Sequence, residues 1–206
     1  MKKQLTTILA AVTFISLALS FPCTAQERMW NFGAETGVSV SKYGQDAELN
    51  DFKSGAIGGL FVTYYIKNSF GITTKVLYAQ KGALLQSSDN KQTLNYIEMP
   101  VIGRFFLNQK GNLRPNIFVG PSFGIMRSAA NKIGNDERVE VGSYKPYYNT
   151  FDFGVTGGMG FDFKVAHDLY FVVDGRYTHG LSDITKAAGV VNNNSFGLTA
   201  GLSFSY

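Results

Sequence analysis

The chain has 206 residues, of which 17% are charged, 14% are aromatic and 23 are glycine. So many large apolar side chains exclude an intrinsically disordered chain, and the single cysteine excludes a disulfide scaffold. The formal net charge of +4 at pH 7 is modest and scattered along the chain, so nucleic acid is not an expected partner.

The N-terminus has the pattern of a secretory signal peptide. A positively charged start at residues 1–3 precedes an apolar stretch at 8–21, and small residues up to Ala25 then offer a cleavage site. An alternative is a lipoprotein acylated at Cys23, but Pro22 fits that processing site poorly. We therefore predict a cleaved signal peptide at 1–25 and one exported domain at 26–206. Beyond the signal, no apolar run reaches the roughly 20 residues of a membrane-spanning helix.

Eight segments of the mature chain alternate between apolar residues and small or polar ones with a period of two, which indicates strands. In chain order, these segments are 30–41, 55–67, 70–82, 93–107, 116–127, 150–164, 169–179 and 194–206. In the last segment, the even-numbered residues from Phe196 to Tyr206 are apolar, and the odd-numbered ones are serine, glycine or threonine. Pro100 lies inside the fourth segment, where we expect a local β-bulge.

The strands are long enough to cross a bilayer, which takes about 9–11 residues of a tilted strand. Only a closed barrel leaves no unpaired backbone in hydrocarbon. A soluble periplasmic barrel of lipocalin type would expose its polar face, which should then be rich in Lys and Glu. The polar face here is mostly glycine, serine and threonine, which suit the narrow interior of eight strands. The predicted fold is all-β: an eight-stranded antiparallel transmembrane up-and-down β-barrel.

The connectors between these segments alternate in length. The long ones are 42–54, 83–92, 128–149 and 180–193, and the short ones are 67–69, 108–114 and 164–168. Outer-membrane barrels have short periplasmic turns and longer external loops. The sequence thus predicts that the protein lies in the outer membrane of a Gram-negative cell. Both mature termini should be periplasmic, and 128–149 should be the longest external loop.

Several stretches resemble the PorT-type outer-membrane β-barrel family of Bacteroidota, also described as the porin family or outer membrane protein beta-barrel domain. They are GLFVTYYI (59–66), LYAQKGA (77–83), LNYIEMPVIGRFF (94–106), FVGPSFGIMRSA (118–129) and RYTHGLSDI (176–184). The resemblance implies a barrel over most of the mature chain, and a link to protein secretion or cell-surface assembly. It also places Glu98 and Pro100 in a Y-x-E-x-P stretch of that family.

Charged residues on the polar face are the candidate functional residues. They are Glu35, Lys75, Glu98, Arg104, Asp152, Asp162, Asp174 and Arg176. In a narrow interior, charges of both signs favour a hydrogen-bonded, ion-paired plug, because an unpaired buried charge is costly. The alternative is a proton or ion pathway, which would make the protein a narrow porin or transporter.

The alternative of an enzyme rests on three residues near the end of the seventh segment, His179, Ser182 and Asp183, whose types suit a nucleophile, base and orienting group. Ser-Asp beside glycine is more often turn chemistry, so we predict no catalytic activity. The glycines of 157–160 lie within a strand and do not form a phosphate-binding loop. We expect no cofactor and no metal.

The expected partners are outer-membrane lipid and envelope or secretion proteins, with the protein itself a monomer.

Overall fold

The long strands expected from the period-two pattern are all present. The computed structural model describes residues 29–43, 50–51, 53–85, 90–108, 111–133, 139–140, 149–183 and 192–206. Its strands are β1 (Trp30–Tyr43), β2 (Asn50–Asp51), β3 (Lys53–Lys67), β4 (Phe70–Leu85), β5 (Asn90–Phe106), β6 (Leu113–Ile133), β7 (Val139–Glu140), β8 (Phe151–Lys164), β9 (Leu169–Gly180) and β10 (Asn193–Ser205). None of the described residues forms a helix long and apolar enough to cross a membrane. The expected signal peptide and Cys23 lie outside the described residues.

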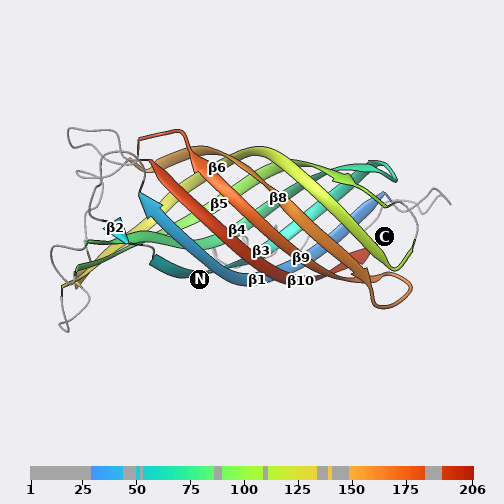
Figure 1. Cartoon of the computed structure of the whole chain (residues 1–206), viewed down its shortest axis with the longest axis horizontal. Helices are drawn as coiled ribbons and strands as arrows, with labels where there is room; N and C mark the ends of the chain where they lie inside the picture. The colour runs from blue at the N-terminus through green and yellow to red at the C-terminus, as the bar shows by residue number, and fades with distance from the viewer. Residues whose placement is uncertain are drawn as a thin grey trace, which may run out of the picture.

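The eight strands other than the two-residue β2 and β7 close into a barrel (Figure 1). Each long strand pairs antiparallel with the next along the chain, and β10 pairs again with β1 from Asn31↔Ser205 to Tyr43↔Asn193. Valine, phenylalanine, tyrosine and threonine recur in these strands because such side chains pack well on a pleated surface. Since the last long strand pairs with the first, the barrel wall has no open edge. The predicted eight-stranded antiparallel up-and-down barrel is confirmed.

Side chains alternate between the two faces of the barrel wall. Large apolar residues point outward: Leu60 is 66% exposed and Val119 is 61% exposed. Polar and charged residues point inward, where Lys75 is 2% exposed and Glu98 is 1% exposed. This is the polarity of a membrane barrel and the reverse of a water-soluble one. The lipocalin-type alternative is therefore wrong.

The two ends of the barrel differ. At one end the connections are short: Asn68 and Ser69 join β3 to β4, and residues 165–168 join β8 to β9. The chain also returns to this end, where the amide of Tyr206 donates to the carbonyl of Trp30 at 2.9 Å. At the other end β9 and β10 are joined by the longer segment 181–192. These are called below the short-turn end and the long-loop end.

At the long-loop end, β4, β5 and β6 extend furthest beyond the strand ends that the sequence predicted. β4 and β5 stay paired up to Leu85↔Asn90, so the connector between them is much shorter than the predicted 83–92. β6 stays paired with β5 up to Ile133, so the start of the predicted loop 128–149 is strand. The alternation of apolar and polar residues stops before these segments, but backbone pairing, which needs no such alternation, continues through them. Residues 134–138 and 141–148 lie outside the described residues.

The bulge expected at Pro100 is not there. The register between β5 and β6 is unchanged from Pro100↔Ser122 to Gly103↔Val119. A register shift lies instead between Asn95 and Tyr96. Proline removes one backbone donor without adding a residue, so it interrupts hydrogen bonding locally and leaves the strand in phase.

Candidate functional site: the charged interior of the barrel

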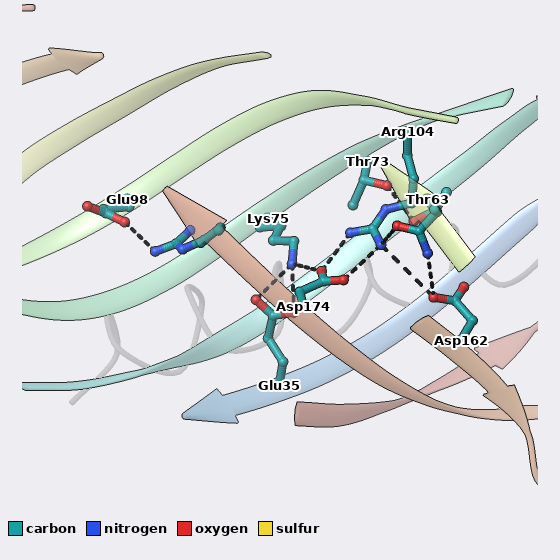
Figure 2. A network of polar contacts seen from close by, with 10 residues as sticks. Glu35, Thr63, Thr73, Lys75, Glu98, Arg104, Asp162 and Asp174 are labelled. Atoms are coloured by element: carbon teal, nitrogen blue, oxygen red, sulfur yellow. Dashed lines mark hydrogen bonds and ion pairs between the residues drawn. The ribbon is translucent and has the colours of Figure 1, made fainter. Parts of the chain in front are cut away.

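The interior of the barrel holds all the charged residues singled out from the sequence. They come from β1 (Glu35), β4 (Lys75), β5 (Glu98, Arg104), β8 (Asp152, Asp162) and β9 (Asp174, Arg176). Each is at most 6% exposed. Because side chains alternate along each strand, these residues point inward, and closure of the barrel brings residues of distant strands into contact. They fall into two clusters, and Figure 2 shows the one around Asp174 together with Glu98 of the other.

The first, the Asp174 cluster, consists of Glu35, Lys75, Arg104, Asn116, Asp162 and Asp174. Lys75 Nζ lies 2.7 Å from Glu35 Oε2 and 2.8 Å from Asp174 Oδ2, so it bridges β1 and β9. Arg104 binds Asp174 through both terminal nitrogens, at 2.9 Å and 2.6 Å. Asp174 thus accepts from two cations across the interior, and such two-point binding fixes the side chains in one geometry.

Asn116 extends the Asp174 cluster toward the short-turn end. Its Oδ1 accepts from Arg104 at 2.7 Å, and its Nδ2 donates to Asp162 Oδ1 at 3.1 Å. Arg104 also lies 4.0 Å from Asp162. The amide therefore connects a cation to a carboxylate, each through the end of suitable polarity.

The second, the Glu98 cluster, lies nearer the long-loop end and consists of Lys81, Glu98, Asp152, Arg176 and Ser182. Glu98 pairs with Lys81 and, at 2.8 Å, with Arg176. Lys81 lies 4.0 Å from Asp152, which accepts a hydrogen bond from Ser182 Oγ at 2.9 Å. Ser182 follows β9, so the cluster links the interior to the connector between β9 and β10.

The buried charges of the described residues balance. The negative ones are Glu35, Glu98, Asp152, Asp162 and Asp174, and the positive ones are Lys53, Lys75, Lys81, Arg104 and Arg176. Five of each sign give a formal net charge of zero. An ion in a low-dielectric interior is tolerated only when it is paired and hydrogen-bonded. Carboxylate partners are present here for Lys75, Lys81, Arg104 and Arg176.

Aromatic rings fill the space beside the cations. Lys75 Nζ lies 5.4 Å from the centroid of the Phe61 ring, and the guanidinium of Arg104 lies 4.7 Å from that of Phe118. At the short-turn end, Arg114 lies over Phe106 at 4.2 Å. Each contact is a cation–π interaction that also excludes water, so the interior is packed by rings as well as by ion pairs.

Gly160 makes room for the Asp174 cluster. A Cβ at this position would overlap Asp174 Oδ1 and would lie 2.8 Å from Asn116 Oδ1 and 3.0 Å from Arg104 Nη1. The polar face of β8 therefore needs a residue without a side chain here, which explains one of the glycines of 157–160.

Three residues of the interior are missing from the candidates singled out from the sequence: Lys53, Lys81 and Asn116. Lys81, six residues after Lys75, falls on the predicted polar face of the third segment and belongs among those candidates. Lys53, whose Nζ donates to the carbonyl of Lys81 at 3.3 Å, lies in a segment that was assigned to a loop. The sequence places Asn116 on the polar face, but only the register of β5, β6 and β8 shows that it connects Arg104 to Asp162.

His179 and Ser182, two of the three residues considered for catalysis, make separate contacts. His179 Nδ1 lies 2.8 Å from Asn194 Oδ1, and its ring stacks on Tyr177. Ser182 Oγ donates a hydrogen bond to Asp152 and accepts one from the amide of Phe153 at 2.8 Å. Among the contacts of the described residues, none joins His179 to Ser182. Nor do the described residues contain a group of three or more His, Cys, Asp or Glu arranged to hold a metal.

The sequence model of a known family, the outer membrane protein beta-barrel domain, matches residues 24–186. This match covers well over half of the chain and most of the barrel. The chain belongs to this family. As an outer-membrane β-barrel, it has its apolar face in contact with lipid and its polar clusters inside.

Solved outer-membrane barrels share the fold. Neisserial surface protein A (NspA) is 14% identical over 85% of this chain and 97% of its own, with a TM-score of 0.53. Outer membrane protein W of E. coli is 12% identical over 88% of this chain and 100% of its own, with a TM-score of 0.51. At these identities the likeness shows the fold alone. No curated protein sequence matches the chain.

Proposed function

We propose that this outer-membrane barrel is a closed anchor with a structural or interaction role at the cell envelope, and neither an open diffusion pore nor an enzyme. The observation that carries the proposal is the pair of charge clusters inside the barrel. Lys75 and Arg104 cross the interior to reach Asp174, and the five buried cations match five buried carboxylates. A hydrated ion would have to part these pairs in order to pass.

The finer proposal is a role in secretion or surface assembly, as implied by the resemblance to the PorT-type family of Bacteroidota. The stretches 59–66, 94–106 and 176–184 support it. In this proposal the signal peptide directs export through the general secretory pathway. The short-turn end then faces the periplasm together with both mature termini, and the long-loop end faces outward.

Conductance in planar bilayers tests the closed anchor. The purified protein should show little steady current in KCl, because eight strands leave an interior that side chains can fill. Large stable channels of nanosiemens size would contradict the proposal and would give the interior charges a pore-lining role. Asp174→Ala is the informative variant, since it removes the acceptor shared by Lys75 and Arg104 and should raise the frequency of openings.

Crosslinking in living cells tests the interaction role. A photoreactive residue at Arg127, exposed toward the long-loop end, or at Asn112, exposed at the short-turn end, reports on each side of the membrane. The same probe at lipid-facing Leu198 is the matched control. A specific protein captured from Arg127 supports surface recognition, and one captured from Asn112 supports envelope machinery.

The interaction role is wrong if neither site captures a protein while a deletion strain loses a lipid- or peptide-modifying activity. In that case His179, Ser182 and Asp183 become the first residues to substitute.

A further inference from the structure

Three polar side chains form a row on the outer face of the barrel at the long-loop end. They come from β1, β10 and β9, which are neighbours in the barrel wall (Figure 1). The register pairs Lys42 with Asn194, and Asn194 Oδ1 lies 2.8 Å from His179 Nδ1. Lys42 and His179 are exposed. These three residues are called the polar row below.

The polar row lies at the edge of the lipid-facing surface. Two residues deeper on the same strands, the register sets Val40 against Phe196 and Phe196 against Tyr177. Phe196 is 53% exposed and Tyr177 is 50% exposed. Outer-membrane barrels place aromatic girdles where hydrocarbon meets the headgroups, and successive outward residues of a strand are about 6.7 Å apart. The polar row therefore lies at the level of the lipid headgroups.

Asn194 and His179 hold each other in one orientation. Asn194 Oδ1 accepts from the amide of Gly180 at 3.3 Å and from His179 Nδ1, because an amide oxygen can only accept. The imidazole ring also stacks on Tyr177. Among the contacts of the described residues, none involves His179 Nε2 or Asn194 Nδ2. Two nitrogen atoms are thus fixed at the outer surface and available to a partner from outside the protein.

The outer face carries no negative charge to compete with an anion at this row. Lys42 points outward and adds a positive charge beside the two nitrogen atoms. Every aspartate and glutamate of the eight long strands points into the barrel instead: Glu35, Glu98, Asp152, Asp162 and Asp174. A lysine ammonium binds phosphate as a point charge, and phosphate is the anionic group that membrane lipids place at this level. Charge and hydrogen bonding therefore both fit the polar row to a lipid phosphate.

We propose that the polar row binds a lipid whose headgroup carries a phosphate monoester, as in phosphatidic acid and lipid A. Neighbouring strands are about 4.8 Å apart, so a phosphate fits between the two outer side chains of the row. Lys42 Nζ and Asn194 Nδ2 donate to two of its three terminal oxygens, and His179 Nε2 shares a proton with the third. The acyl chains lie over Phe196 and Tyr177. A phosphodiester headgroup has only two free oxygens and leaves one of the three nitrogen atoms without a partner.

Native mass spectrometry of the detergent-purified protein tests the affinity. One phosphatidic acid should bind about tenfold more tightly than phosphatidylglycerol with the same acyl chains, as expected from one hydrogen bond to a charged group. Lys42→Gln and Asn194→Ala should each weaken the binding of phosphatidic acid to a similar degree. Arg127→Gln is the matched control and should bind like the unsubstituted protein. It removes an exposed cation at the same end, but on β6, which pairs with none of the three strands. Circular dichroism verifies that each variant is folded.

Nitrogen NMR of the imidazole rings in detergent micelles tests the contact itself. The chain has two histidines, and the side chain of His167, at the short-turn end, is 85% exposed and serves as the internal control. Phosphatidic acid should shift the Nε2 signal of His179 and leave that of His167 unchanged. Inorganic phosphate at the same concentration should shift neither signal, because it lacks the acyl chains that contact the apolar face.

Three results would overturn the lipid site. They are phosphatidylglycerol bound as tightly as phosphatidic acid, Lys42→Gln and Asn194→Ala variants that bind like Arg127→Gln, and a His179 signal that inorganic phosphate shifts as strongly as the lipid does. The last result would mean an anion site without a lipid. The proposal goes beyond the closed anchor, which concerns the interior. A large steady KCl current through the same protein would contradict the anchor and leave the lipid site in place.

Discussion

The two faces of the same strands obey different rules. On β8, Met159 points outward and is 60% exposed, while Asp162, three residues further along, points inward and is 4% exposed. Lipid has no fixed shape, so the outer face needs only to be apolar. The inner face packs atom against atom, and Asn116 must present its oxygen to Arg104 and its nitrogen to Asp162. The outer face is specified by composition, and the inner face by individual contacts.

Removing the central carboxylate of the interior should have the largest effect. Asp174→Ala leaves Lys75 and Arg104 buried without the acceptor they share, and removing one partner of a buried ion pair costs about 3–5 kcal/mol. The free energy of unfolding, from urea titrations in lipid vesicles, should fall by that amount. Val173→Ala, the same truncation on the outward face of β9, is the control and should cost much less. Equal losses for both variants would show that the interior is no more specific than the exterior.

A charge on the outer face should have the next largest effect. Met159→Arg puts a cation into hydrocarbon near the middle of β8, and arginine near the bilayer midplane costs about 2–4 kcal/mol. The same urea titration measures this loss. Met159→Leu should be nearly neutral, because the outer face requires only an apolar side chain. If arginine were tolerated as well as leucine, Met159 would not face lipid.

Adding a single methyl group to a glycine should also affect the two faces differently. Gly160→Ala forces a Cβ into Asp174, Asn116 and Arg104, and overpacking of this kind typically costs about 1–3 kcal/mol. Gly175→Ala on the outward face is the control, since a Cβ there would meet only the carbonyl of Met159, at 3.9 Å. It should leave stability unchanged or raise it slightly, because glycine weakens a strand. Equal responses of the two variants to urea would contradict the packed interior.

The sequence predicted the faces well because the side-chain period of a strand is fixed at two. Glu98 and Met99 are neighbours in the chain, yet the pattern assigned one to the interior and the other to lipid, as the structure has them. The pattern fails where the register shifts. Asn95 and Tyr96 are consecutive and both buried, which no period of two predicts.

The ion-pair partners inside the barrel could not be predicted from the sequence. Lys75 and Asp174 are 99 residues apart, and Arg104 and Asp174 are 70 apart. Which cation meets which carboxylate depends on the stagger between strands around the closed barrel, and a single sequence contains no direct sign of that stagger. Strand ends were also misjudged, because pairing as far as Ile133 is a property of the backbone and leaves no apolar pattern.

The smallest expected effect lies where the interior meets the connector after β9. Ser182 Oγ donates to Asp152 and accepts from the amide of Phe153, so Ser182→Ala removes two hydrogen bonds at a partly exposed site. Each such bond contributes about 0.5–1 kcal/mol where water can replace the lost partner, so the free energy of unfolding should fall by about 1–2 kcal/mol. Hydrogen exchange gives the sharper measurement, because the amide of Phe153 loses its acceptor and should exchange faster. Ser54→Ala, at an exposed position of β3, is the control and should change neither quantity. Unchanged exchange at Phe153 would mean that the connector is held by its backbone contacts alone, and the Glu98 cluster would then end at Asp152.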